Sequence, residues 1–274
     1  LYHAGLWAAV RAGWRNGYNA EADHVIITGN NPAEMQASMA AGKLAIERAA
    51  GFTKFTTDTS RMFQLQADER HPSPWTAAEL EAKFAEVLTA EERAWVLEEF
   101  SKPFPIGASG YQFTREEIVR LAVKFGESLK ANEDLYDHIL AVKAAFGTGT
   151  AFDFEPSLDE ADTLTTPKEL IFYMHWLKSR GRPAQLVPPN LGFKKRQAYP
   201  ETVEALEKYS HHKMWPELLP AVKQNFNGDT LAELGSRVSE LAAVARHFDG
   251  TLSIHSGSGK QAAVLEQIGR ATAG

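Results

Sequence analysis

The chain contains no cysteine among its 274 residues. Disulfides and thiolate ligands are therefore excluded, so any bound metal must use histidine and carboxylate side chains. The chain also lacks any apolar run close to the roughly 18 residues that cross a membrane, and it shows no signal peptide. These absences predict a soluble, cytoplasmic protein without a membrane partner.

Positive charge is scarce, with 29 Lys and Arg against 35 Asp and Glu and a net charge of −6. Lys194-Lys-Arg196 forms a basic cluster that is too short to indicate nucleic acid binding. The length and the 44% hydrophobic content suit one large core. We expect a single domain over residues 1–274. Because the sequence starts at Leu1 inside a helical pattern and stops just after another, we also expect material to be missing at both ends.

Strand and helix patterns alternate along the first part of the chain. Val25–Ile27 is apolar and β-branched, as in a buried strand. Asn31-Pro32 opens a helix that reaches about Ala50. Phe52–Ser60 then forms a second strand. A strand, a helix and a strand within about thirty residues indicate a βαβ unit and hence a parallel sheet.

Residues 68–113 interrupt this alternation. Helices over 76–88 and 89–100 each open with a threonine cap, and a proline-rich turn follows them. We interpret this segment as an inserted helical excursion that serves as a lid or a subunit contact in a homo-oligomer. Beyond it, helices are expected over 114–130 and 132–146, and a long irregular surface loop over 192–226.

Polar side chains stand where the predicted strands end: His24, Asp58, Glu155, Asn190 and His255. Four of these five are acids or histidines, and such groups at successive strand ends are typical of the mouth of a (β/α)8 TIM-type barrel. A barrel needs eight strands, so five strands predict an incomplete one. The structural alternative is an open, doubly wound sheet.

Residues 251–260 combine a short strand, His255 and a glycine-rich turn into a helix. Gly257-Ser-Gly-Lys260 suggests a phosphate-binding loop, but Ile254 and Gln261 stand where a Walker loop requires Gly and Ser or Thr. Nucleotide hydrolysis is therefore not predicted. Lys260 stays a candidate for contact with an anionic substrate.

Five segments of the chain, in the order in which they occur, resemble the tagaturonate epimerase family. Members of this family are metal-dependent sugar epimerases of the barrel type. The five segments are Ala20-Glu-Ala-Asp-His24, Phe55-Thr-Thr-Asp58, Phe152-Asp-Phe-Glu-Pro-Ser-Leu-Asp-Glu160, Thr165-Thr-Pro167 and Leu252-Ser-Ile-His-Ser-Gly-Ser-Gly-Lys260. The resemblance runs from about Asn19 to Lys260. It departs from the family at Gly259, where an aspartate is expected, and over residues 188–196.

The resemblance implies a divalent metal, for which His24, Glu155 and His255 supply two imidazoles and a carboxylate. This donor set suits Zn, Mn, Ni or Co. Alternatively Glu155 is the catalytic base and Asp58 replaces it on the metal, and spacing does not separate these assignments. Because both carboxylates stand at strand ends, we expect them to be partly buried.

Substrate contacts are predicted at several further positions. Asp153 lies two residues before Glu155, on the same face of the strand. From there it can contact a metal ligand and fix its orientation without binding the metal itself. Lys194, Arg196 or Lys260 can hold a carboxylate or hydroxyl group of a sugar. The predicted substrate-binding residues are Asp153, Asn190, Lys194, Ser256 and Lys260.

The chemistry that the resemblance implies inverts a hydroxyl-bearing carbon of a ketose or keto-uronate. If that carbon lies one bond beyond the carbinol next to the ketone, its C–H is not acidic, and retro-aldol cleavage with re-closure is the better route. A metal-dependent aldolase with the same ligands and a non-catalytic sugar-binding barrel are the alternatives.

Overall fold

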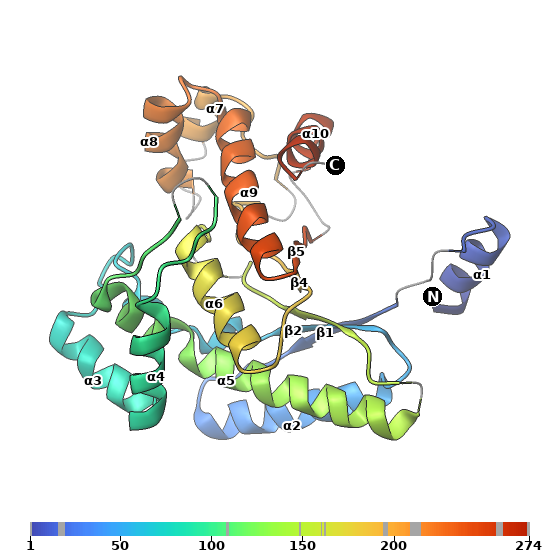
Figure 1. The fold of residues 1–274 in the computed structure, drawn as a ribbon. Coiled ribbons are helices and arrows are strands. Elements are labelled where there is room, and N and C mark those ends of the chain that lie inside the picture. Colours follow the sequence, from blue (N-terminus) through green and yellow to red (C-terminus); the bar gives the residue numbers. More distant parts are fainter. Residues whose placement is uncertain are drawn as a thin grey trace.

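The computed structural model describes residues 2–15, 20–107, 110–147, 149–159, 161, 163–193, 197–208, 215–255 and 260–272 (Figure 1). The strands are β1 (Glu21–Ile26), β2 (Lys54–Asp58), β3 (Asp153–Pro156), β4 (Leu186–Val187) and β5 (Thr251–Leu252). The α-helices are α1 (Tyr2–Arg11), α2 (Pro32–Arg48), α3 (Ala77–Val87), α4 (Ala90–Phe100), α5 (Arg115–Phe146), α6 (Pro167–Ser179), α7 (Val203–Lys208), α8 (Trp215–Asn225), α9 (Thr230–His247) and α10 (Ala262–Ala271). Two 3-10 turns, η1 (Ser60–Met62) and η2 (Leu65–Ala67), follow β2.

The strands of the described residues pair in parallel. One sheet has the order β1-β2-β3, and β4 pairs with β5 in a second sheet. The backbone N–H of Gln185 donates to the carbonyl of Phe154 at 3.0 Å, which places the start of β4 beside β3. The five strands therefore follow one another in chain order. The prediction of an α/β fold with parallel strands is confirmed.

Helices α2 and α5 run along one face of the β1-β2-β3 sheet (Figure 1). Thr57 of β2 donates a hydrogen bond to Asn132 of α5 at 2.6 Å, and the ring of Phe154 meets Tyr136 of α5 at 5.2 Å between centroids. Side chains alternate along a strand, so Thr56 and Glu155 point to the opposite face. This second face carries the polar residues of the sheet.

Gly42 lets α2 approach β1 closely. A Cβ atom at Gly42 would lie 2.9 Å from Val25 Cγ1 and 3.0 Å from Ile27 Cδ1, both in the core. We expect Gly42→Val to lower the free energy of unfolding by about 2–3 kcal/mol because it overpacks this contact. Urea denaturation measures the change. The matched control is Gly269→Val on α10, where a Cβ meets nothing within 4 Å, and an equal loss in both variants would contradict the prediction.

The two helices predicted over 114–130 and 132–146 are one continuous helix, α5. Asn132 favoured a break because asparagine caps helices well. Its side chain is instead buried, accepts from Thr57, and donates to Thr59 and to the Tyr173 hydroxyl. The polar residue thus satisfies a network inside the core, and the helix continues through it.

The irregular loop predicted over 192–226 contains two helices, α7 and α8. Leu206, Leu218 and Val222 are buried, so each helix packs an apolar side chain into the core. Pro220 lies inside α8 and concealed the helical pattern. The prediction of an irregular segment is wrong at these positions.

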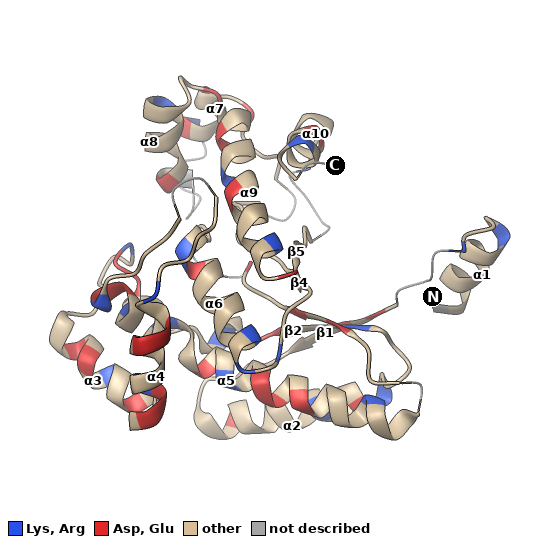
Figure 2. Cartoon of the chain, viewed as in Figure 1, with Lys and Arg blue, Asp and Glu red and all other residues tan. Residues whose placement is uncertain are grey.

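The predicted helices of the 68–113 segment are present as α3 and α4, each opened by a threonine capping box. Phe100 of α4 stacks on Phe172 of α6 with centroids 4.2 Å apart, so the segment is fixed to the core through aromatic rings. Acidic and basic residues are interspersed along the helices (Figure 2). Among the described residues, no helix is long and apolar enough to cross a membrane.

Candidate active site

The polar face of the sheet brings together residues from three neighbouring strands. Glu21 of β1 is paired in register with Lys54 of β2, and Thr56 of β2 with Glu155 of β3. The hydroxyl oxygen of Thr56 lies 2.6 Å from Glu21 Oε1 and 3.2 Å from Glu155 Oε1. The Lys54 ammonium lies 3.2 Å from Glu21 Oε2 and 3.1 Å from Glu155 Oε2. A cation and a hydroxyl therefore join the same two carboxylates.

Glu155 is completely buried, with a relative exposure of 0%. Burial opposes its ionisation, but hydrogen bonds from His255 and Ser253 and the charge of Lys54 lower its pKa to about 2. The carboxylate is thus ionised at neutral pH. The expectation of partial burial is wrong for Glu155, because β3 lies between β2 and β4 and is covered from both sides, whereas Asp58 is half-buried.

His255 follows β5 and lies between two carboxylates. Its Nε2 is 2.9 Å from Glu155 Oε1, and its Nδ1 is 2.9 Å from Asp159 Oδ2. Hydrogen bonds to Asp159 and Glu155 raise the pKa of His255 to about 10, against the effect of burial. Ser157 donates to the other oxygen of Asp159 at 2.5 Å. The result is a continuous chain from Ser157 through Asp159 and His255 to Glu155.

His24 on β1 lies beside this chain. The centroids of its ring and of the His255 ring are 5.0 Å apart, although the residues stand near opposite ends of the sequence. Two imidazoles and a carboxylate therefore occupy one region. Within the part of the chain that the structure describes, however, no three His, Asp or Glu side chains converge in an arrangement ready to hold a metal.

The predicted carboxylates Asp58 and Asp153 lie on the same sheet as Glu155. Asp58 ends β2 and accepts hydrogen bonds through Oδ1 from the backbone N–H and the hydroxyl of Ser60, at 3.0 and 2.6 Å. Asp153 begins β3, is half-buried, and is paired in register with Lys54. The two acids thus mark opposite ends of the strands, and Asp58 lies at the carboxyl end, where parallel α/β proteins place reactive groups.

A family model described as tagaturonate epimerase (UxaE) matches residues 1–214, which is more than half of the chain. The chain belongs to the tagaturonate epimerase family. The resemblance found in the sequence is thereby confirmed.

The chain spans less than half the length of the relatives that it matches. A tagaturonate/fructuronate epimerase of Thermotoga maritima is 26% identical over 257 residues, which cover 93% of this chain and 42% of that protein. Crystal structures of a fructuronate-tagaturonate epimerase from Cohnella laeviribosi match at 22% identity, with TM-scores of 0.61 for the native form and 0.64 for a complex with one glycerol. They cover 97% of this chain and 44% of that protein, so the likeness extends to the fold of less than half of it.

Of the remaining candidate substrate-binding residues, the structure describes Asn190 and Lys260. Asn190 is buried, donates to the Ala161 carbonyl at 2.6 Å and accepts from the Gly192 N–H at 3.0 Å, so these contacts shape its own loop. Lys260 is half-buried, with its ammonium 5.0 Å from the centroid of the Phe193 ring. Burial lowers the pKa of Lys260, and the charge of Asp159 opposes this effect. Lys194, Arg196 and Ser256 lie outside the described residues.

Glu155 and His255 fit a metal ion by donor type. Imidazole and carboxylate groups both bind divalent metals, and Nε2 of His255 is hydrogen-bonded to Glu155 Oε1 at 2.9 Å. Oε2 of Glu155 is buried and accepts no well-formed hydrogen bond from the described residues. Asp159 contacts the other nitrogen of His255, as carboxylates behind metal-bound histidines do. Metal binding at Nε2 would require this imidazole to release a proton.

The sequence interpretation missed Lys54, Thr56 and Asp159 as site residues. The alternation that placed Asp153 and Glu155 on one face also places Lys54, Thr56 and Asp58 on one face of β2, so the signal for Lys54 was present. Asp159 lies beyond the end of β3 in a turn. Its approach to His255 depends on the position of β5, which the local sequence does not determine.

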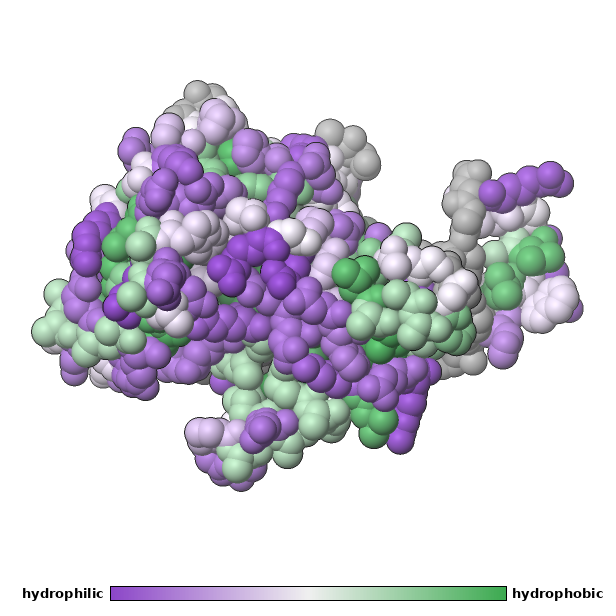
Figure 3. Space-filling model, turned by 60° about the horizontal axis from the view of Figure 1, so that its bottom comes forward, coloured by the Kyte–Doolittle hydropathy of each residue, from purple (hydrophilic) through white to green (hydrophobic). Residues whose placement is uncertain are grey.

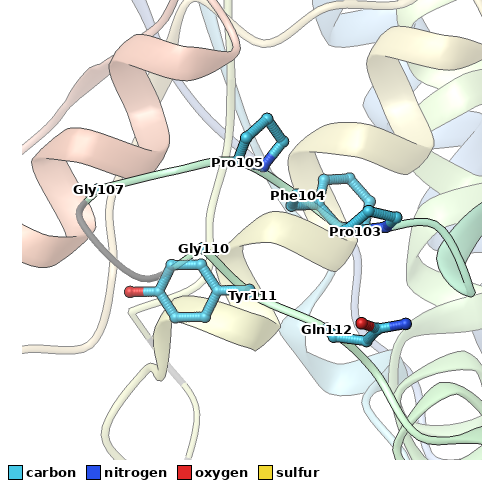
Figure 4. A pocket seen from close by; sticks show the side chains of 7 residues that line it. All are labelled: Pro103, Phe104, Pro105, Gly107, Gly110, Tyr111 and Gln112. Carbon is cyan, nitrogen blue, oxygen red and sulfur yellow. The ribbon is translucent and has the colours of Figure 1, made fainter.

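The 68–113 segment also forms a hollow of about 440 Å³ (Figure 4). Phe104 and Tyr111 form an antiparallel bridge there, with both backbone N···O distances at 2.8 Å. The lining comprises Pro103, Phe104, Pro105, Gly107, Gly110, Tyr111 and Gln112. These residues come from the loop between α4 and α5, whereas the polar site lies on the strands.

Proposed function

We propose that this chain forms the site of an epimerase that acts on a ketose or a keto-uronate. One observation supports this most directly: a buried, ionised Glu155 is linked through His255 to Asp159, with His24 beside them. A carboxylate and two imidazoles, carried at the alternate strands β1, β3 and β5, are groups that can bind a catalytic divalent metal. Membership of the tagaturonate epimerase family gives the reaction class.

We also propose that the five strands are part of a (β/α)8 barrel. Parallel strands that follow one another in chain order, β1 to β3 and then β4 and β5, support this architecture. A doubly wound sheet reverses its strand order at a switch point, and the described strands have no such reversal. The polar face of β1-β2-β3 would then line the interior of the barrel.

His24, His255 and Glu155 would hold a divalent metal in this proposal. When bound, such an ion polarises the ketone oxygen and stabilises negative charge that develops on it. Asp159 would hold the His255 ring in the orientation required of a ligand.

Asp58 is the better candidate for proton transfer, and Glu155 for the metal. Glu155 has no exposed surface, and its oxygens already face His255, Thr56 and Lys54. Asp58 is half-buried at the carboxyl end of β2, where a sugar hydroxyl can reach it. It would take the hydroxyl proton as the carbon–carbon bond breaks and return it to the oxygen of the new stereocentre after the aldehyde fragment has turned.

The substrate is proposed to include neutral ketoses. Gly259, which lies outside the described residues, replaces an acid that the family is expected to have, and the 188–196 segment also departs from the family. Glycine has no side chain, so the negative charge of that acid is absent here. We therefore propose that fructose or tagatose is accepted at least as readily as the corresponding uronate.

The test compares turnover of fructose and fructuronate by the purified protein, with a divalent metal added and after thorough chelation. We expect epimer formation from fructose at least equal to that from fructuronate, and loss of both reactions on chelation. A strong preference for the uronate would contradict the substrate proposal, and activity that survives chelation would contradict metal dependence. Release of shorter fragments would identify an aldolase, and sugar binding without any product would indicate a binding protein.

A further inference from the structure

Lys54 occupies a position that the proposed mechanism does not use. It begins β2, in register with Glu21 at the start of β1 and Asp153 at the start of β3. Its side chain is only 14% exposed, and its ammonium lies between Glu21 Oε2 and Glu155 Oε2. Because Glu155 is paired with Thr56, two residues further along β2, the long lysine side chain extends along the strands to reach it.

The contacts of Glu155 divide between its two oxygens. Oε1 faces His255 and the hydroxyl of Thr56, Lys54 is the ionic neighbour of Oε2, and the side chain of Ser253 also donates to this carboxylate. A carboxylate held at one oxygen only can turn about its terminal bond, which has a broad rotational preference. The ammonium at Oε2 restricts that rotation, and it holds Oε1 against Nε2 of His255.

Glu21 holds Lys54 in place from the other side. Its carboxylate contacts the ammonium through Oε2 and Thr56 through Oε1, so Glu21, Lys54, Thr56 and Glu155 form a closed ring of contacts. The Glu21 side chain is 40% exposed, whereas that of Glu155 has no exposure. The ring thus connects the surface to the buried carboxylate.

We propose that Lys54 is a positioning residue that acts through Glu155 and that Glu21 supports it. The expected effect of Lys54 on turnover rests on the proposed function. The expected effect of Lys54 on the position of the Glu155 carboxylate does not depend on that function. Replacing Lys54 by Met keeps the apolar part of the side chain but removes the cation. The Glu155 carboxylate would then turn, and its contact with Nε2 of His255 would weaken.

Two measurements on Lys54→Met test this proposal. Side-chain ¹⁵N NMR of the metal-free protein, assigned with His255→Gln, should show that the Nε2 signal of His255 moves while the Nδ1 signal facing Asp159 stays. In the metal-loaded protein, kcat should fall by about 10- to 100-fold, which is the loss typical when a residue that orients a metal ligand is removed. KM should stay near the wild-type value.

The matched control is Lys43→Met, because Lys43 forms an ion pair with Asp134 between α2 and α5 at 2.7 Å, away from the site. It should change neither the His255 signals nor kcat. Glu21→Gln, a second test at a more exposed residue, should change both in the same direction as Lys54→Met but by less. If Lys54→Met does not fold, Glu21→Gln decides in its place.

Wild-type Nε2 signals and kcat in Lys54→Met, or in Glu21→Gln where that variant decides, would overturn the proposal. If the wild-type protein epimerises no ketose or keto-uronate, the proposed function fails, and the NMR comparison alone decides the role of Lys54. A lower melting temperature with unchanged His255 signals and kcat would show that Lys54 only stabilises the fold.

Discussion

Replacing Glu155 by Gln should reduce epimerase turnover by at least about 100-fold while the protein stays folded. The amide has the shape of the carboxylate but no charge, and its NH₂ group would face either the His255 N–H or the Lys54 ammonium. Both neighbours are donors, so one contact becomes repulsive. Lys54 keeps Glu21 as a partner and His255 keeps Asp159. We therefore expect a loss of stability of only about 1–3 kcal/mol.

A second histidine–carboxylate pair provides the matched control for this variant. Nε2 of His175 lies 3.0 Å from Glu99 Oε1, where α6 meets α4 and away from the polar face of the sheet. Glu99→Gln should leave turnover unchanged. Initial rates, metal content and urea denaturation of both variants measure the effects. If Glu155→Gln kept full activity and metal content, the carboxylate would have a structural role.

The parallel organisation of the fold could be predicted from the sequence because its signals are local. Apolar β-branched residues at 25–27, the proline that opens α2 and the capping box at Thr114 each report on their own neighbourhood. Period-two alternation likewise placed Asp153 and Glu155 on one face. Such patterns identify elements and faces without reference to the remainder of the chain.

The contacts within the site could not be predicted in this way. That Nδ1 of His255 meets Asp159, and that the Lys54 ammonium reaches Glu155, depends on which strands are neighbours and on their register. The continuity of α5 has a similar cause, because Asn132 behaves as a core residue only where Thr57 and Tyr173 surround it. Tertiary packing overrides a local preference at each of these positions.

Apolar side chains are exposed at the first helix, α1. Trp7, Val10 and Trp14 in and just after α1 are exposed, each by more than half, and Figure 3 shows apolar side chains on the arm that α1 forms at the right. The helical pattern at the start of the sequence is present as α1, and these apolar side chains are exposed in the described part of the chain. An amphipathic pattern therefore indicates a helix correctly even where it does not indicate what the helix contacts.

A buried cluster of charges connects α5 and α6 to the turn after η2. The Lys124 ammonium is 2.6 Å from both Asp68 Oδ2 and Glu169 Oε1, and its side chain is 3% exposed. Arg70 Nη2 contacts the same two oxygens at 2.7 and 3.0 Å. Burial opposes ionisation of Asp68, but the hydrogen bonds and charges of Arg70 and Lys124 hold its pKa well below the usual range. Each of the two cations thus contacts both carboxylates.

We expect Lys124→Met to lower the free energy of unfolding at pH 7 by about 3–5 kcal/mol, because it leaves two buried carboxylates with one cation. The effect has a defined pH dependence. Asp68 in the wild type stabilises the fold above its unfolded pKa of about 3.9, and this contribution is lost as the pH falls through the lower folded-state pKa. Without Lys124 the folded-state pKa of Asp68 rises toward its unfolded value, so the stability of the variant should fall less steeply with pH below about 3.9 than that of the wild type.

Urea denaturation at pH 7 and an acid titration followed by circular dichroism measure both effects of Lys124→Met. Lys83→Met is the matched control, since Lys83 and Glu86 form an exposed pair on α3 at 2.7 Å, and it should change stability by less than about 0.5 kcal/mol. Adding Asp68→Asn to Lys124→Met should recover part of the loss, because one fewer buried carboxylate then shares the charge of Arg70. A Lys124→Met protein as stable as the control would show that the cluster contributes no net stability.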